Sequence, residues 1–164
     1  KRKPIVLGAM REHIMKKHNG VMWANLEADD VMGIMATEPT VDEERILVSI
    51  DKDMRTIPCN LSQDGMTIEQ IPEKIANYNF MIQTIMGDKT DGYDGIEGVG
   101  IKTAEKLLLK YTNCTLSDLW KIVKGIYKEK GYTQKEALQQ ARVAHILRHG
   151  EYNKKTGKVK LWTI

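Results

Sequence analysis

The chain has 164 residues, 41% of them apolar and 29% charged, so it can bury a core, and no apolar run approaches the roughly 20 residues of a membrane span. Cys59 and Cys114 lie too far apart for a zinc site, which favours free thiols in a reducing compartment. The net charge of +3 is unevenly distributed along the chain. Residues 1–98 contain 11 Lys and Arg against 17 Asp and Glu, whereas residues 99–164 contain 14 Lys and Arg against 5 Asp and Glu. This asymmetry indicates contact with nucleic acid.

The first forty residues are predicted to be mostly helical. Residues 5–18 carry apolar side chains at helical spacing and stop at Asn19-Gly20, and residues 21–23 favour a short strand. Residues 27–37 predict a second helix whose first turn holds several acids beside its positive dipole end. The methionines of both helices are expected to pack in the core. The start at Lys1 without a secretory leader suggests that the sequence begins inside a longer protein.

The next segment predicts strands followed by a helix. Residues 45–50 indicate a buried strand that ends at Asp51, and the carboxyl end of a strand is where open α/β folds place ligands. Residues 66–71 predict a weak strand or a loop. Residues 73–86 predict a helix that ends at Gly87.

The second half is predicted to be mostly helical. Apolar stripes at helical spacing cover residues 101–111, 116–127 and 137–145. Residues 152–162 favour a terminal hairpin with its turn at Gly157. We expect Trp120 in the core, and Trp162 closing the hairpin onto the body. The overall class is therefore α/β with a helical carboxyl-terminal part.

Three carboxylate clusters stand in the first part of the chain. Hard divalent ions such as Mg²⁺ prefer oxygen ligands, and two ions about 4 Å apart can promote in-line hydrolysis of a phosphodiester. Each cluster taken alone is also explained by helix capping or by a surface turn. Together they predict phosphodiester hydrolysis with Mg²⁺, for which Mn²⁺ could substitute. The clusters comprise Glu27, Asp29 and Asp30, then Asp51 and Asp53, then Asp88 and Asp91.

A glycine-rich hairpin that opens a helix follows the last acid cluster. Glycines at Gly98 and Gly100 allow a tight turn whose amides, with the following helix N-terminus, can meet a phosphate. Lys102, Thr103 and Lys106 stand on the first turns of that helix and are candidate DNA contacts. Such contacts bind the backbone rather than the bases and depend on salt.

Taken together, the motifs resemble the structure-specific 5′ nucleases, a family that includes flap endonucleases, the 5′-nuclease domain of bacterial DNA polymerase I and phage 5′ exonucleases. The resemblance covers nearly the whole chain, is weakest after Asn113 and is most like a small phage exonuclease. The motifs occur in the family's order: Glu-Ala-Asp-Asp at 27–30, Ser-Ile-Asp-Lys-Asp at 49–53, Gly-Asp-Lys-Thr-Asp at 87–91 and Gly-Val-Gly-Ile-Lys-Thr-Ala at 98–104.

The resemblance implies a division of the chain. Residues 1–86 would form the carboxyl-terminal part of a PIN-like metal-binding nuclease core. Residues 87–164 would form a helix-hairpin-helix (helix-three-turn-helix) DNA-binding region and the terminal hairpin. Family members carry two further aspartates and an arch near their amino terminus. The two aspartates have no counterpart here, and of the arch only the trailing edge would be present, at Lys1–Lys3.

The resemblance also implies roles for the residues at the matching positions. Glu27, Asp29 and Asp30 would serve a first metal ion, and a K⁺ ion would be held by the backbone carbonyls of Ile96 and Val99 at the hairpin. The second metal ion would be served by Asp51, Asp53, Asp88 and Asp91.

We therefore expect a Mg²⁺-dependent 5′ to 3′ exonuclease or flap endonuclease that acts on duplex DNA with a free or displaced 5′ end, in phage DNA replication or degradation in the host cytoplasm. A replication polymerase or a single-strand-binding protein would be its protein partner. Two alternatives remain open. One is a non-catalytic module that binds duplex DNA without sequence preference, and the other is a PIN-type ribonuclease, against which the hairpin after Asp91 argues.

Overall fold

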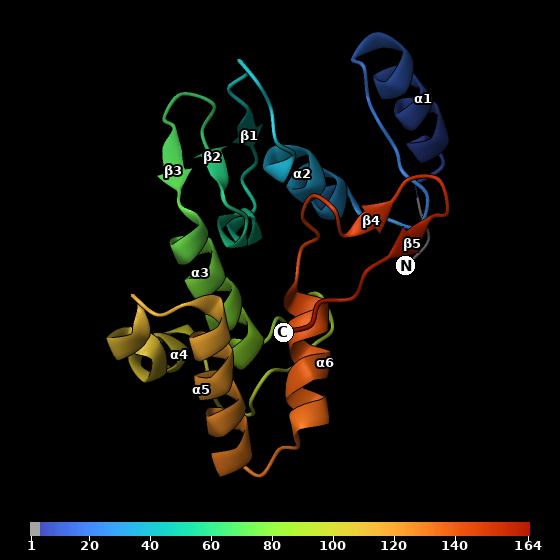
Figure 1. The fold of residues 1–164 in the computed structure, drawn as a ribbon. Coiled ribbons are helices and arrows are strands. Elements are labelled where there is room, and N and C mark those ends of the chain that lie inside the picture. The colour runs from blue at the N-terminus through green and yellow to red at the C-terminus, as the bar shows by residue number, and fades with distance from the viewer. Residues whose placement is uncertain (1–3) are drawn as a thin grey trace.

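A computed structural model describes residues 4–164, so the predicted trailing edge of an arch at Lys1–Lys3 lies outside the described residues. The fold is mixed α/β, and the long helix α3 (Glu73–Met86) runs through its middle and links two parts (Figure 1). None of the helices in the described part is long and apolar enough to cross a membrane.

A small sheet packs on one side of α3. It contains β1 (Ile46–Val48), β2 (Cys59–Ser62) and β3 (Glu69–Ile71) in that order, with β1 parallel and β3 antiparallel to β2. The short 3-10 helix η1 (Lys52–Thr56) connects β1 to β2 and packs against α3. The apolar cluster beneath this sheet is lined by Leu47, Met54, Ile57, Leu61, Ile71, Ala76 and Ile146.

A helical layer packs on the other half of α3 and contains the larger core. It consists of α4 (Ile101–Leu108), the short 3-10 helix η2 (Leu109–Tyr111), α5 (Leu116–Glu129) and α6 (Gln134–Ala144), which pack around α3 in Figure 1. Helix α6 begins at a capping box between Thr133 and Glu136. The helices predicted in this half are therefore confirmed.

The terminal hairpin is also confirmed. Strands β4 (Tyr152–Asn153) and β5 (Lys158–Val159) pair in antiparallel register, and Gly157 in the turn has a φ of +66°. Trp162 follows the hairpin and lies edge-on to Trp120 at 5.0 Å between ring centroids. Both indoles are buried, so both tryptophan predictions are confirmed.

Two strand predictions for the first half were wrong, and one strand was missed. Residues 21–23 form no strand, because Trp23 stacks on Tyr152 instead of joining the sheet. The strand predicted as buried over 45–50 is only three residues long and buries Leu47 alone, because β1 is the edge of the described sheet. Strand β2 was not predicted at all.

The expected packing of the early methionines was wrong for the first helix. Helix α1 (Leu7–Lys17) stands away from the body in Figure 1, and none of its residues is buried. Helix α2 (Ala28–Thr37) does pack through Val31, Gly33 and Ile34, but Met35 is exposed. A Cβ at Gly33 would lie 2.8 Å from a methyl of Ile146, so glycine there lets α2 approach the chain after α6.

Candidate metal centre and phosphate-binding hairpin

Three aspartates from two chain segments converge. Asp53 lies in the first turn of η1, just after β1, while Asp88 and Asp91 lie in the turn that follows α3. One carboxylate oxygen from each of the three lies within 4.8 Å of the other two. The structure thus brings Asp53 together with two aspartates that stand 35 and 38 positions later in the sequence.

Local hydrogen bonds hold these carboxylates in place. Asp51 caps η1, because its Oδ1 accepts the amide of Asp53 at 2.9 Å. After α3, the backbones of Asp88 and Tyr93 exchange two hydrogen bonds of 2.8 and 3.1 Å, which close the turn that carries Asp91. Asp88 Oδ1 also accepts the amide of Thr90 at 2.8 Å.

The turn after α3 is joined to the glycine hairpin by a close backbone crossing. Gly87 ends α3 with φ +69° and ψ 176°, a conformation that is essentially restricted to glycine. A Cβ on Gly87 would lie 2.6 Å from the carbonyl oxygen of Asp94, and a Cβ on Gly95 would meet the backbone of Gly87. The two glycines therefore fix the acids and the hairpin relative to each other.

The acids in this cluster exceed the positive charge that faces them. Lys52 Nζ lies 3.0 Å from Asp88 Oδ2, and this hydrogen bond is the main reason why the pKa of Asp88 lies below its usual range. Burial, reinforced by the charge of Asp51, raises the pKa of Asp53. Burial and then the charge of Asp88 raise the pKa of Asp91. Lys52 is thus one lysine against four carboxylates, those of Asp51, Asp53, Asp88 and Asp91. A divalent cation would relieve the repulsion between these negative charges.

The donors at this cluster fit a hard divalent ion. Carboxylate oxygens suit Mg²⁺ and Mn²⁺, and no His or Cys joins the group within the described residues. Gln83 is buried on α3, and its side chain acts against the upward shift of the Asp53 pKa, which places it near the cluster. Its Oε1 is buried and has no hydrogen-bond partner among residues 4–164, and a hydrated ion held nearby would supply the donor that this oxygen lacks. The residues present are therefore compatible with the implied metal.

The three acids at the start of α2 are placed differently from one another. Glu27 is the exposed N-cap residue, and its side chain makes no capping bond. Of these three acids, Asp29 is among the charges that raise the pKa of Asp91, after those of Asp88 and Asp51. Asp30 is half-buried, and its Oδ1 accepts the amide of Leu147 at 3.1 Å. Asp30 therefore fastens α2 to the chain that follows α6.

The hairpin between the acid cluster and α4 presents an open backbone. Gly98 has a φ of +74°, and nothing lies within 4 Å of a Cβ placed on Gly98 or Gly100. The side chains of Ile96 and Val99 are buried and anchor the hairpin, and the carbonyl of Ile96 accepts the amide of Val99 at 3.1 Å. The predicted contacts Lys102, Thr103 and Lys106 are all exposed on α4.

Two side chains from the helical layer support this hairpin from behind. Gln140 Oε1 accepts the amide of Gly95 at 2.9 Å, and the hydroxyl of Tyr132 accepts the amide of Glu97 at 3.1 Å. The same residues line a cavity of about 670 Å³ under the hairpin. The hairpin is therefore held from α6 and from the turn that precedes it.

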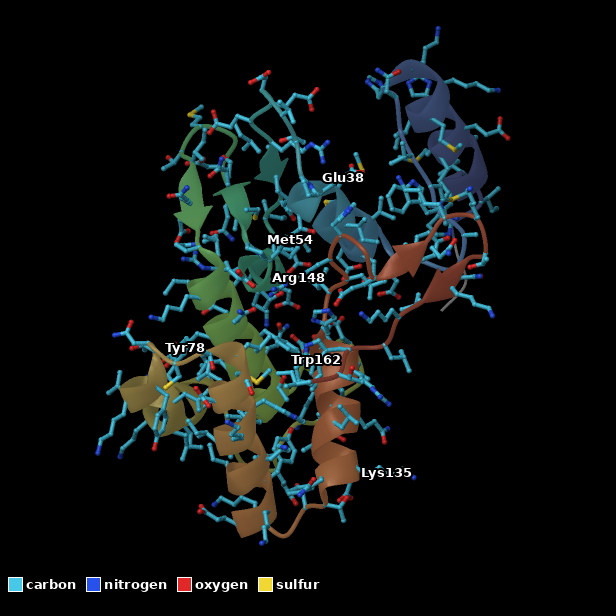
Figure 2. All side chains as sticks on the ribbon, viewed as in Figure 1. Glu38, Met54, Tyr78, Lys135, Arg148 and Trp162 are labelled. Carbon is cyan, nitrogen blue, oxygen red and sulfur yellow. The ribbon has the colours of Figure 1, made fainter. Side chains whose placement is uncertain are left out.

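Sequence reasoning missed several residues that support the site. Lys52 could have been noticed because it stands between two of the predicted ligands. Gln83, Tyr132 and Gln140 carry no local signal. Arg148 has no local sequence signal either. It lies between the two parts of the molecule in Figure 2, and its guanidinium group donates to the carbonyl of Thr56, at the end of η1, at 3.0 Å.

Comparisons with known proteins place this geometry in context. The chain is 33% identical to the exodeoxyribonuclease of Enterobacteria phage T3 and 34% identical to the exonuclease of Escherichia phage T7, in each case over 84% of this chain and 55% of the relative. It is 26% identical to the flap endonuclease Xni of Shewanella woodyi, over 86% of this chain and 60% of the relative. No family model matches. The chain spans little more than half the length of these curated relatives.

Proposed function

Because the chain belongs to the 5′ nuclease family, as its motifs predicted, we propose that it serves a Mg²⁺-dependent 5′ to 3′ exonuclease or flap endonuclease. The substrate would be duplex DNA with a free or displaced 5′ end. The observation that carries this proposal is the convergence of Asp53, Asp88 and Asp91. The adjoining glycine hairpin supports it.

The acids would supply the metal-holding side of the site. Asp53, Asp88 and Asp91 would hold one ion with Asp51 beside them, and Glu27 and Asp29 would face a second. Bound ions of this kind neutralise the scissile phosphate, activate water and stabilise the leaving oxygen. The bond between Asp30 and Leu147 supports a structural role for Asp30 in addition to any contact with an ion.

Lys52 would change its partner when the site is filled. Its ammonium group hydrogen-bonds Asp88, and its side chain is largely exposed, so it is free to turn. A metal ion bound by Asp88 would repel the ammonium group, and the nearest alternative anion would be a substrate phosphate. Lys52 would then orient that phosphate against the acids.

The hairpin would hold the duplex away from the cut. Its open amides at Gly98 and Gly100, with Lys102 and Lys106 on α4, suit a sugar-phosphate backbone and carry no base specificity. A K⁺ ion at the carbonyls of Ile96 and Val99 would add a positive charge at the same place. Binding through these groups should weaken steeply as salt rises.

A cleavage assay tests this proposal. The chain is incubated with labelled DNA that carries a recessed 5′ end or a 5′ flap, in Mg²⁺ and in Mn²⁺, and with RNA of the same sequence. We expect metal-dependent release of 5′-terminal products from DNA, abolished in Asp53→Asn and retained in the matched control Glu129→Gln on the outer face of α5. Duplex binding without cleavage in either metal would contradict the proposal, and so would a preference for RNA.

A further inference from the structure

We propose that the terminal hairpin and Trp23 form a second nucleic-acid site, which binds an unpaired DNA strand beside the acids of α2. We call this surface the lysine hairpin and define it as residues 152–160 together with Trp23. The inference takes only its substrate class, DNA, from the proposed function. The acids and the glycine hairpin contribute nothing to its contacts.

Positive charge is concentrated on this hairpin. Four of the nine residues at 152–160 are lysines, all of them exposed, and none forms an ion pair with an acid in the part of the chain that the structure describes. Four unpaired ammonium groups on so short a turn repel one another, and a phosphate backbone would relieve that repulsion. The lysines are Lys154, Lys155, Lys158 and Lys160.

An aromatic stack adjoins the lysines. The rings of Trp23 and Tyr152 lie 5.9 Å apart with an interplanar angle of 12°, so the indole is supported on one face. The hydroxyl of Tyr152 donates to the carbonyl of Ala24 at 2.9 Å and fixes the hairpin to the segment that leads into α2. Lys154 Nζ lies 4.0 Å over the indole and covers the other face.

This arrangement suits a stacked base. A cation over an exposed indole is held weakly, whereas a nucleic-acid base stacks more strongly on an aromatic ring. A base that arrives on Trp23 would displace Lys154, and the released ammonium group would be close to that nucleotide's own phosphate. Every base has an aromatic face, so this contact would be independent of sequence.

The position of the lysine hairpin indicates the strand that it would bind. It borders the pocket of about 200 Å³ that Asn25, Glu27 and Asp29 share with Val159 on β5. A paired base is stacked on its neighbours and has no face free for Trp23. An unpaired strand close to the acids would therefore be bound here, while duplex would be bound by the glycine hairpin.

Tryptophan fluorescence tests the inference directly. Trp23 is partly exposed, whereas Trp120 and Trp162 are buried and give a constant background. The intact chain is titrated with an oligothymidylate of about 12 nucleotides, a length within the usual range of single-strand sites, in the absence of divalent metal. We expect quenching on binding. In Trp23→Leu the quenching should vanish and the affinity should fall by about 10-fold, while Trp23→Phe should keep most of the affinity.

Lysine variants supply a second measurement that does not disturb the aromatic stack. Replacing Lys155 and Lys158 together by Gln should reduce the slope of log affinity against log salt by about 1.4, because each single-strand phosphate contact contributes about 0.7. Lys135→Gln is the matched control, because Lys135 lies at the other end of α6 from the hairpin (Figure 2). Its slope should equal that of the unaltered chain. If Trp23→Leu fails to fold, as judged by its melting curve, the lysine pair alone decides.

Absence of quenching by the single strand, when duplex still binds, would overturn the inference. A slope of log affinity against log salt that falls as much in Lys135→Gln as in the double lysine variant would also overturn it. The same holds if Trp23→Leu loses as much affinity for duplex as for single strand. The proposed function fails separately: if the chain quenches with single strand as expected but never cleaves DNA in Mg²⁺ or Mn²⁺, the lysine hairpin stands and the nuclease assignment falls.

Discussion

Replacing Gly87 by alanine should damage the fold and the metal centre together. Gly87 ends α3 at φ +69° and ψ 176°, where an L-residue is strained by about 1–3 kcal/mol. A Cβ there would also lie 2.6 Å from the carbonyl oxygen of Asp94, so the backbone crossing with Gly95 must open. Overpacking of this kind costs about 1–3 kcal/mol more. We expect Gly87→Ala to lose about 2–6 kcal/mol of unfolding free energy, a large share of a typical total of 5–15 kcal/mol.

Gly92 provides the control from the same turn. Its φ is +81°, but nothing lies within 4 Å of a Cβ built on it, so Gly92→Ala carries the left-handed backbone cost of about 1–2 kcal/mol without the collision. Urea unfolding followed by circular dichroism measures both variants, without metal and with Mg²⁺. The stabilisation by Mg²⁺ should shrink in Gly87→Ala and persist in Gly92→Ala. Equal stability losses in the two variants would refute the argument that the backbone crossing sets the geometry.

Three further predictions follow from single contacts. Tyr127→Phe should lower the unfolding free energy by about 1–3 kcal/mol, because the buried hydroxyl donates to the carbonyl of Thr84 at 2.6 Å, and an unchanged urea midpoint would contradict this. Arg148→Met should cost at least as much, because it leaves the carbonyl of Thr56 without its side-chain donor, and differential scanning calorimetry should show a lower melting temperature. Hydrogen bonds from the backbone hold the pKa of Asp64 at about 2. The ionised carboxylate therefore stabilises the fold above about pH 4, and this stabilisation should disappear as the pH falls toward 2. Asp64→Asn should flatten the profile of unfolding free energy against pH in that range.

The residues that recur in motifs could be predicted from sequence, whereas their supports could not. Asp53, Asp88 and Asp91 stand at ends of predicted elements, and their residue type alone indicates oxygen coordination. Their roles as ligands stay predictions. Gln83 has no such signal, because its side chain becomes buried near Asp53 only after α3 has packed against η1.

The errors in the predicted fold have physical causes. Apolar residues over 45–50 looked like a buried strand, yet burial depends on neighbours, and β1 has a partner on only one edge in the described sheet. Helix α1 has the right spacing but no covering element among the described residues. Trp23 lies next to apolar residues that favour a strand, and its contact with Tyr152, far along the chain, overrode that local preference.

The most direct test of the central claim is a metal titration of the proposed cluster. Electron paramagnetic resonance of free Mn²⁺ counts the ions that the chain binds, and competition with Mg²⁺ shows whether both use the same site. The Asp91 side chain is exposed and takes no part in the side-chain hydrogen bonds of the cluster, so Asp91→Asn removes a charge with little structural cost. We predict Mn²⁺ binding that Mg²⁺ displaces, weakened at least 10-fold in Asp91→Asn and unchanged in Glu129→Gln. Equal binding by both variants would contradict a metal centre at Asp53, Asp88 and Asp91.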